Sequence, residues 1–88
     1  MPRWANKRDV NDLDVFRALQ TAGRNPLRGR DFDIAAEHVG GWGVMLEVKR
    51  DSKAKLRPIQ KSLQRLFRER YIRVNSVEQA LIACGIAL

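Results

Sequence analysis

The chain is predicted to form one small α/β domain of the mixed α+β kind, in which helices pack against a mixed sheet. Its length of 88 residues suits a single domain. Three runs have the length and apolar content of strands, at residues 32–38, 44–49 and 71–74. Runs with helical apolar spacing lie before, between and after these strands, and they predict the order α-β-β-α-β-α.

Signals for the start or the end of a helix accompany each of the three helical runs. They are Asn11 and Gly23 for the first, Pro58 for the second, and Ser76 with Gln79, then Gly85, for the third. Ser76 and Gln79 match a capping box, and Pro58 suits the first helical position, where a missing N–H does no harm. The second helix has one apolar face, which we expect to pack on the sheet. That face comprises Ile59, Leu63, Leu66 and Phe67.

The first two predicted strands are joined by the glycine-rich segment 40–43 and are expected to form a hairpin. Side chains alternate across a strand, so Glu47 and Lys49 share one face. The opposite face is the expected core side and carries Val44, Leu46 and Val48. If the strands pair as a hairpin, Asp33 of the first strand reaches the same place as Glu47.

Two carboxylates beside a lysine form the candidate catalytic centre. Carboxylates that converge on one point are unfavourable unless a proton or a cation lies between them. Mg²⁺ prefers oxygen ligands and binds one or two carboxylates while keeping several waters. Such an ion polarises a phosphodiester and lowers the pKa of a water, which Lys49 would orient. The alternative interpretation is that Asp33 is a turn residue and that Glu47 and Lys49 form an exposed pair on a half-solvated strand.

The charge of the chain favours a polyanionic partner. Seventeen Lys and Arg face ten Asp and Glu, which gives a net charge of +7 and an isoelectric point near 10.5. Nucleic acid is the first candidate and an acidic membrane surface the second. Phosphate contacts are expected from basic residues of the loops and of the second helix. These residues are Arg28, Arg30, Lys53, Lys55, Arg57, Lys61 and Arg65.

Composition argues against membrane-spanning and disulfide-bonded proteins. No stretch approaches the roughly 20 apolar residues of a transmembrane helix, and the polar, basic residues 1–8 do not resemble a secretory signal. Cys84 is the only cysteine, so no internal disulfide can form, and its apolar surroundings are typical of a buried thiol. We expect a cytoplasmic protein with a basic arm at residues 1–8 and a folded domain at residues 9–88.

The order and spacing of these motifs resemble the PD-(D/E)xK nuclease superfamily. Within it, they look like the compact VRR-NUC group, which includes short phage-borne relatives of Holliday junction resolvases. The resemblance covers about residues 9–87 and implies a restriction-endonuclease-like αββαβα core. The segments that carry it are Asp33-Ile-Ala-Ala, Leu46-Glu-Val-Lys49, Leu56-Arg-Pro-Ile-Gln60, Tyr71-Ile-Arg-Val and Ser76-Val-Glu-Gln-Ala-Leu.

The resemblance also implies a role for each matching position. Asp33, Glu47 and the backbone carbonyl of Val48 would bind Mg²⁺, for which Mn²⁺ can substitute. Lys49 would assist the attacking water. Gln60 matches a glutamine near the start of the helix after the catalytic strand, and it would support the site or contact DNA.

The chain departs from the family pattern at several positions. Phe32 replaces the usual proline before the aspartate, and Arg57 replaces the usual Ser or Thr helix cap. Asp14 stands where relatives have a helical glutamate that completes the metal shell, so it is a tentative further ligand. Asp31 has the same strand parity as Asp33 and is the alternative to it as a metal ligand.

The sequence therefore predicts a Mg²⁺-dependent endonuclease that hydrolyses DNA phosphodiester bonds, in a bacterial or phage-encoded protein. Its expected substrate is branched DNA such as a Holliday junction, and its expected form is a homodimer, because cutting a junction needs two symmetric sites. The alternative is a non-catalytic nucleic-acid-binding module, such as a degenerate nuclease subunit. That alternative predicts salt-sensitive binding with no dependence on metal.

Overall fold

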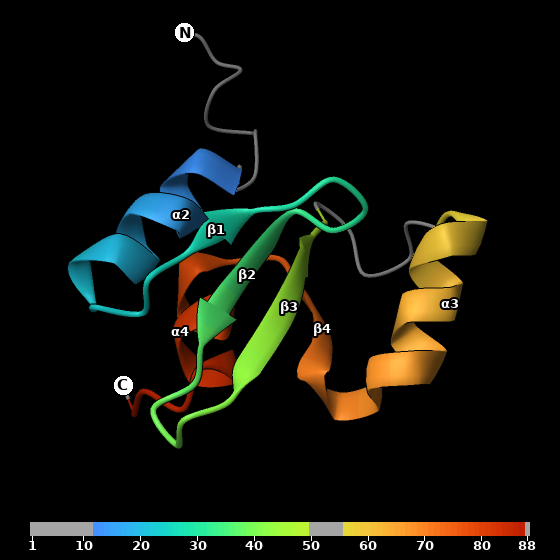
Figure 1. Cartoon of the computed structure of the whole chain (residues 1–88). Helices are drawn as coiled ribbons and strands as arrows, with labels where there is room; N and C mark the ends of the chain where they lie inside the picture. Colours follow the sequence, from blue (N-terminus) through green and yellow to red (C-terminus); the bar gives the residue numbers. More distant parts are fainter. Residues whose placement is uncertain (1–11, 50–55, 88) are drawn as a thin grey trace, which may run out of the picture.

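The computed structural model describes residues 12–49 and 56–87, which form helices around a four-stranded mixed sheet (Figure 1). The predicted α+β class is therefore confirmed. In chain order the elements are α2 (Asp12–Thr21), β1 (Leu27–Arg28), β2 (Ile34–Glu37), β3 (Gly43–Val48), α3 (Pro58–Phe67), the 3-10 helix η1 (Arg68–Arg70), β4 (Tyr71–Val74) and α4 (Val77–Ala83). The predicted arm at residues 1–8, the predicted cap Asn11, and Lys53 and Lys55 lie outside the described residues. No helix in the described part of the chain has the length and the hydropathy that a bilayer span needs.

The strands follow one another across the sheet in the order β1-β2-β3-β4. β2 and β3 pair antiparallel, with Ile34 opposite Leu46, which confirms the predicted hairpin. β3 and β4 pair parallel, with Glu47 opposite Arg73. Parallel neighbours need a long crossover connection, and the segment that contains α3 supplies it.

The hairpin turn between β2 and β3 is held by an aromatic contact. The rings of His38 and Trp42 stack with their centroids 4.1 Å apart. Gly40 lies under the indole, where an added Cβ would come within 2.4 Å of a Trp42 ring carbon. The backbone N–H of Gly40 also donates to His38 Nδ1 at 2.8 Å. A larger residue at position 40 would therefore displace the Trp42 ring from its present place.

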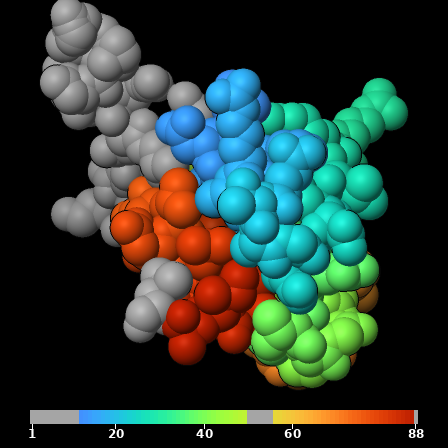
Figure 2. Space-filling view, turned by 90° about the vertical axis from the view of Figure 1, so that its left-hand side faces the viewer, coloured from blue at the N-terminus to red at the C-terminus, as the bar shows by residue number. Residues whose placement is uncertain are grey.

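The core lies between the sheet and the pair α2 and α4. Figure 2 faces this side and shows α2 in blue above the orange and red C-terminal segment. Leu46 points into the core, as its strand parity predicted, and burying a side chain of this size contributes about 1.5–3 kcal/mol. Burial also raises the pKa of the Cys84 thiol, which keeps this cysteine in its unreactive form. The core residues are Val15, Leu19, Ile34, Ala36, Val44, Leu46, Val74, Ala80 and Cys84.

Both signals predicted around the last helix are confirmed. Ser76 is the N-cap of α4, and its Oγ accepts from the backbone N–H of Gln79 at 3.1 Å. The Gln79 side chain bonds back to the chain before the helix, but its Oε1 accepts from Asn75 N at 2.7 Å rather than from Ser76. Gly85 has a φ of +87°, a left-handed conformation that suits glycine and ends the helix.

The apolar face of α3 does not pack on the sheet, which corrects the prediction. Figure 1 shows α3 standing apart from α2 and α4, beyond β4. Gln60 is the buried residue of α3, whereas Leu66 is 72% exposed and Ile59 is 44% exposed. Gln60 faces the sheet because the sheet presents Glu47 there, and a buried carboxylate needs hydrogen-bond donors. The other polar residues of the helix are exposed.

A short strand that the sequence patterns did not predict lies between α2 and β2. Leu27 and Arg28 form the short strand β1, which pairs antiparallel with β2 through Ala35 and Ile34. Both side chains of β1 are exposed, so the strand has no apolar alternation that a sequence pattern could reveal. Its backbone extends the sheet at the edge where the chain approaches Asp33.

Candidate active site

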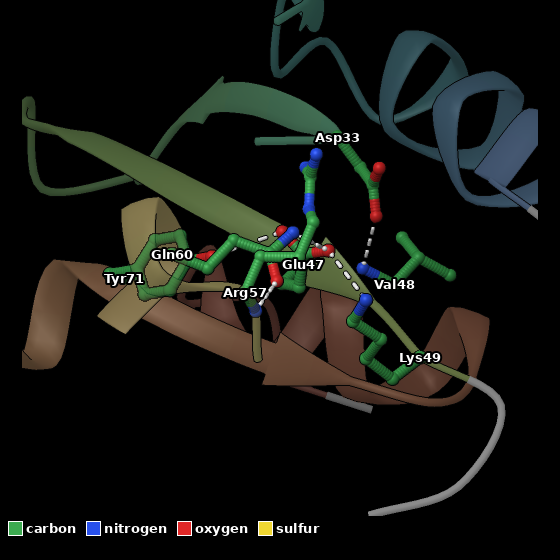
Figure 3. A network of polar contacts seen from close by, with 7 residues as sticks. All are labelled: Asp33, Glu47, Val48, Lys49, Arg57, Gln60 and Tyr71. Atoms are coloured by element: carbon green, nitrogen blue, oxygen red, sulfur yellow. Dashed lines mark hydrogen bonds and ion pairs between the residues drawn. The ribbon is translucent and has the colours of Figure 1, made fainter. Parts of the chain in front are cut away.

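The face of the sheet opposite α2 and α4 carries the predicted catalytic side chains (Figure 3). Glu47 lies in β3 and Lys49 directly follows it, so both point away from the core side of Leu46. Asp33 directly precedes β2, and continuing the β2–β3 register places it opposite Glu47. The structure thus brings Asp33, Glu47 and Lys49 together.

The Glu47 carboxylate is only 1% exposed and is surrounded by donors. Gln60 Nε2 donates to its Oε2 at 2.8 Å, and the Tyr71 hydroxyl donates to its Oε1 at 3.0 Å. Lys49 Nζ lies 3.1 Å from Oε2. Desolvating a carboxylate is costly unless it is paired and hydrogen-bonded, so these three groups hold the charge in place. The alternative interpretation, an exposed pair on a half-solvated strand, is wrong for Glu47.

Gln60 links the start of α3 to this carboxylate. Its Oε1 accepts from the backbone N–H of Arg57 at 2.9 Å, while its Nε2 donates to Glu47. The first bond satisfies a donor at the helix start, where Arg57 offers no capping side chain of the usual kind. Both ends of the amide are therefore used, and Gln60 cannot rotate without losing a bond. Gln60 therefore holds the Glu47 carboxylate in place, and its part in catalysis stays a prediction.

Tyr71 is a site residue that the sequence patterns did not single out. It opens β4, which is the parallel neighbour of β3, and its side chain is 5% exposed. Burial raises the pKa of its hydroxyl, and the hydrogen bond to Glu47 raises the pKa further. Tyr71 therefore keeps its proton and remains a donor to Glu47. The available sequence signal was an aromatic hydroxyl on a strand predicted to join the same sheet.

Asp33 is held by the neighbouring strand and influenced by two other acids. Its Oδ2 accepts from the backbone N–H of Val48 at 2.8 Å. Burial raises the pKa of Asp33 above its ordinary value of 3.8, the bond from Val48 opposes this rise, and Glu47 and Asp12 add to it. A carboxylate whose pKa rises beside another carboxylate marks a place that attracts a proton or a cation.

The other acids predicted near the site lie differently. Asp31 is exposed, whereas Asp33 contacts β3, so the geometry favours Asp33 as the partner of Glu47. Asp14, the tentative ligand, is exposed in the first turn of α2. Asp12, in the same turn, is the helical acid whose charge reaches Asp33. Sequence spacing missed Asp12, which pairs with Arg28 of β1, a residue 16 positions further along the chain.

The donor set can be compared with what different metals require. Within residues 12–49 and 56–87, no three His, Cys, Asp or Glu side chains gather in a way that could hold a metal ion. A structural zinc ion takes four protein ligands, so the site does not fit that metal. Mg²⁺ needs only one or two carboxylates and fills its other positions with water and substrate oxygens. Asp33 and Glu47 fit Mg²⁺ in this respect, and Val48 lies beside them through the bond from its backbone N–H to Asp33.

The residues predicted to contact phosphate fall into two groups. Arg28 is already engaged, because its Nη1 lies 2.9 Å from Asp12 Oδ2 and its guanidinium lies 4.8 Å from the centre of the Phe16 ring. The remaining described members are exposed on the loop before β2 and on α3, and they are Arg30, Arg57, Lys61 and Arg65. The basic surface beside the site is thus formed chiefly by the beginning and the outer side of α3.

Replacing Asp33 by Asn is expected to stabilise the metal-free protein increasingly as the pH rises. The folded state binds the Asp33 proton more tightly than the unfolded chain, so ionising this group costs stability once the pH exceeds its ordinary value of 3.8. Asn can still accept the bond from Val48 N through its side-chain oxygen. Urea unfolding in chelator, from pH 4 to pH 7, measures the difference in free energy between variant and wild type. The exposed Asp31→Asn is the control, and an Asp33→Asn difference that stays constant or reverses with pH contradicts the expectation.

No family model, no curated protein and no solved structure matches this chain. What the site does chemically is therefore inferred from its own residues: a buried, fully bonded glutamate, an aspartate on the adjoining strand, and a lysine between the glutamate and solvent.

Proposed function

We propose that this protein is a Mg²⁺-dependent nuclease that hydrolyses DNA phosphodiester bonds, with Asp33, Glu47 and Lys49 at its active centre. The observation that carries the proposal is the burial of Glu47 beside Asp33, with a full set of donors on Glu47 and Lys49 at the exposed edge. Such an arrangement costs stability, and a site that binds a cation accounts for it.

Each residue has a distinct part in the proposed reaction. Asp33, Glu47 and the Val48 carbonyl would hold the metal, which when bound polarises the phosphodiester and makes a nearby water more acidic. Lys49, whose side chain is 24% exposed, orients the attacking water and offsets negative charge that develops on the phosphate. Gln60 and Tyr71 are positioning residues, because they act through the Glu47 carboxylate.

The proposed substrate is a branched or otherwise structured DNA. The net charge of +7 and the exposed basic residues on α3 beside the site favour a phosphate backbone. Such a protein would act in the cytoplasm of a bacterium or of a phage-infected cell. RNA is the other polyanion that this surface suits, and a parallel assay on an RNA strand distinguishes the two substrates.

Cleavage of a four-way DNA junction is expected with Mg²⁺ or Mn²⁺ and is expected to stop on addition of chelator. The reason is that Asp33 and Glu47 repel each other unless a cation lies between them. Product lengths on a denaturing gel, compared with those from a linear duplex and a single strand, give the substrate preference. If the protein binds the junction in a salt-sensitive manner but cuts nothing with either metal, the alternative of a non-catalytic binding module holds instead.

We further propose that two copies pair through the exposed apolar face of α3. A chain of 88 residues buries only a modest core, and exposed apolar patches commonly mark a contact with a partner. Leu66→Lys is therefore expected to shift the protein from dimer to monomer in sedimentation velocity. Leu27→Lys is the matched control, because Leu27 is 68% exposed and Leu66 is 72% exposed, and Leu27 lies on the edge strand β1. A wild type that stays monomeric at high concentration contradicts the proposed dimer.

A further inference from the structure

A small pocket next to Lys49 is lined by cationic and amide side chains. It measures about 130 Å³, several times the roughly 10–15 Å³ that one water needs. Its lining residues are Lys49, Arg73, Val74, Asn75 and Gln79. None of these five described residues is acidic, and the carboxylate partner of Lys49, which is Glu47, lies outside this lining.

Arg73 is the unusual member of this lining. Its Nε and Nη2 atoms are buried and have no hydrogen-bond partner among the described residues. Guanidinium groups that leave water are normally paired, because the uncompensated charge and the unmade hydrogen bonds both cost stability. Because both atoms are buried, the Arg73 side chain has to shift slightly before a group in the pocket can reach them. An anion there would supply the missing acceptors and a negative charge.

The position of Arg73 connects the pocket with the proposed active centre. Arg73 pairs with Glu47 across the parallel strands β3 and β4, so the two side chains leave the same face of the sheet. The backbone N–H of Lys49 donates to Val74 O at 2.9 Å, which holds the end of β3 against the strand that carries Arg73. Lys49 therefore borders Glu47 on one side and the pocket on the other.

The donors around the pocket suit a tetrahedral oxyanion. Nε and Nη2 lie on one edge of the planar guanidinium, and such an edge binds two oxygens of a phosphate at once. Gln79 uses its Oε1 to accept from Asn75 N, which leaves its amide nitrogen as a donor. Lys49 adds a second positive charge.

We propose that this pocket binds a phosphate group through Arg73, and that in the substrate complex this group is a backbone phosphate beside the scissile one. The second statement rests on the proposed nuclease function, whereas the first does not. Arg73 would then fix the position of the strand relative to Glu47 and Lys49, without taking part in the chemistry.

The first arm of the test is binding of inorganic phosphate to the whole metal-free protein in chelator. The Nε–H resonance of Arg73 in an NMR titration is expected to shift with phosphate, and not with potassium chloride of equal ionic strength. Arg73→Gln should bind phosphate at least about 10-fold more weakly, read from backbone amides of Asn75 and Gln79. Arg73→Lys keeps the charge but loses the paired N–H groups of the guanidinium, and its affinity for phosphate should lie between those of the wild type and Arg73→Gln. Arg17→Gln, which removes an exposed charge from α2 on the other side of the sheet, should match the wild type.

The second arm is binding of a DNA oligonucleotide in chelator at several salt concentrations. If the pocket holds a backbone phosphate, Arg73→Gln should reduce the slope of log affinity against log salt by about 0.7–0.9, and Arg17→Gln should not. Phosphate binding that does not depend on Arg73 overturns the pocket. Phosphate binding that depends on Arg73 with an unchanged DNA slope overturns the backbone assignment and marks a site for free phosphate. If both arms depend on Arg73 but the wild type cleaves nothing with Mg²⁺, the pocket stands and the proposed nuclease function fails.

Discussion

Replacing Glu47 by Gln is expected to lower Mg²⁺-dependent DNA cleavage at least about 100-fold, which corresponds to about 3 kcal/mol in the activation barrier. The change removes the charge on which the proposed metal binding depends, but it keeps the shape of the side chain. The fold should survive, because the amide oxygen can accept from Gln60 Nε2 and the amide nitrogen can donate to the Tyr71 hydroxyl. Circular dichroism and initial cleavage rates test both statements.

Measuring cleavage and melting temperature for variants of both residues distinguishes the proposed role of Glu47 from that of Lys49. Lys49→Met should lose cleavage to a similar extent, yet it should retain the rise in melting temperature that the proposed Mg²⁺ binding is expected to give the wild type. Glu47→Gln should lose both. Glu78→Gln, which neutralises an exposed acid on α4, is the matched control and should behave as the wild type. If the Glu47 and Lys49 variants cut as well as the wild type, the assignment of the active centre is wrong.

Replacing Gln60 by Leu is expected to damage both stability and cleavage. The change removes the donor to Glu47 Oε2 and the acceptor for Arg57 N, so a buried carboxylate loses one of its partners. Such a loss lowers the free energy of unfolding by about 2–3 kcal/mol, because Glu47, which keeps its charge, stays buried with one donor fewer. Cleavage should fall at least about 10-fold even in the fraction that remains folded, because Glu47 is no longer held at one oxygen.

Gln64 offers a matched control for this experiment, because it lies one turn further along α3 and is exposed. Gln64→Leu should change the free energy of unfolding by less than about 0.5 kcal/mol, as is usual for exposed positions. Urea unfolding gives the stability of both variants. Cleavage is compared without urea, at a temperature at which both variants are folded. Equal stability of the two variants would show that Gln60 carries no special contact.

Elements with strong local signals were predictable from the sequence. The alternation of residues 44–49 placed Leu46 in the core and Glu47 on the opposite face, and the structure has both there. The pairing of β2 with β3 followed from the glycine-rich turn. Ser76 and Gly85 marked the ends of α4 because helix ends need particular side chains or a left-handed residue.

Features that depend on distant partners were not predictable. The apolar spacing of α3 predicts an apolar face but not what that face contacts. In the structure the buried residue of α3 is Gln60, because its amide bonds the buried Glu47 carboxylate. Tyr71 is 24 residues from Glu47, so no local pattern joins them. Asp12 lies 21 positions before Asp33, so no local pattern shows that its charge raises the pKa of Asp33.

The parallel pairing of β3 with β4 determines when, during synthesis, the proposed active centre can be completed. Glu47 obtains its donors from residues that follow it by as much as 24 positions, across the α3 crossover. While a ribosome has produced only the hairpin, that carboxylate has neither Gln60 nor Tyr71 and stays hydrated. A nascent or truncated chain that stops before β4 therefore contains every acid of the proposed centre and is still expected to be inert toward DNA.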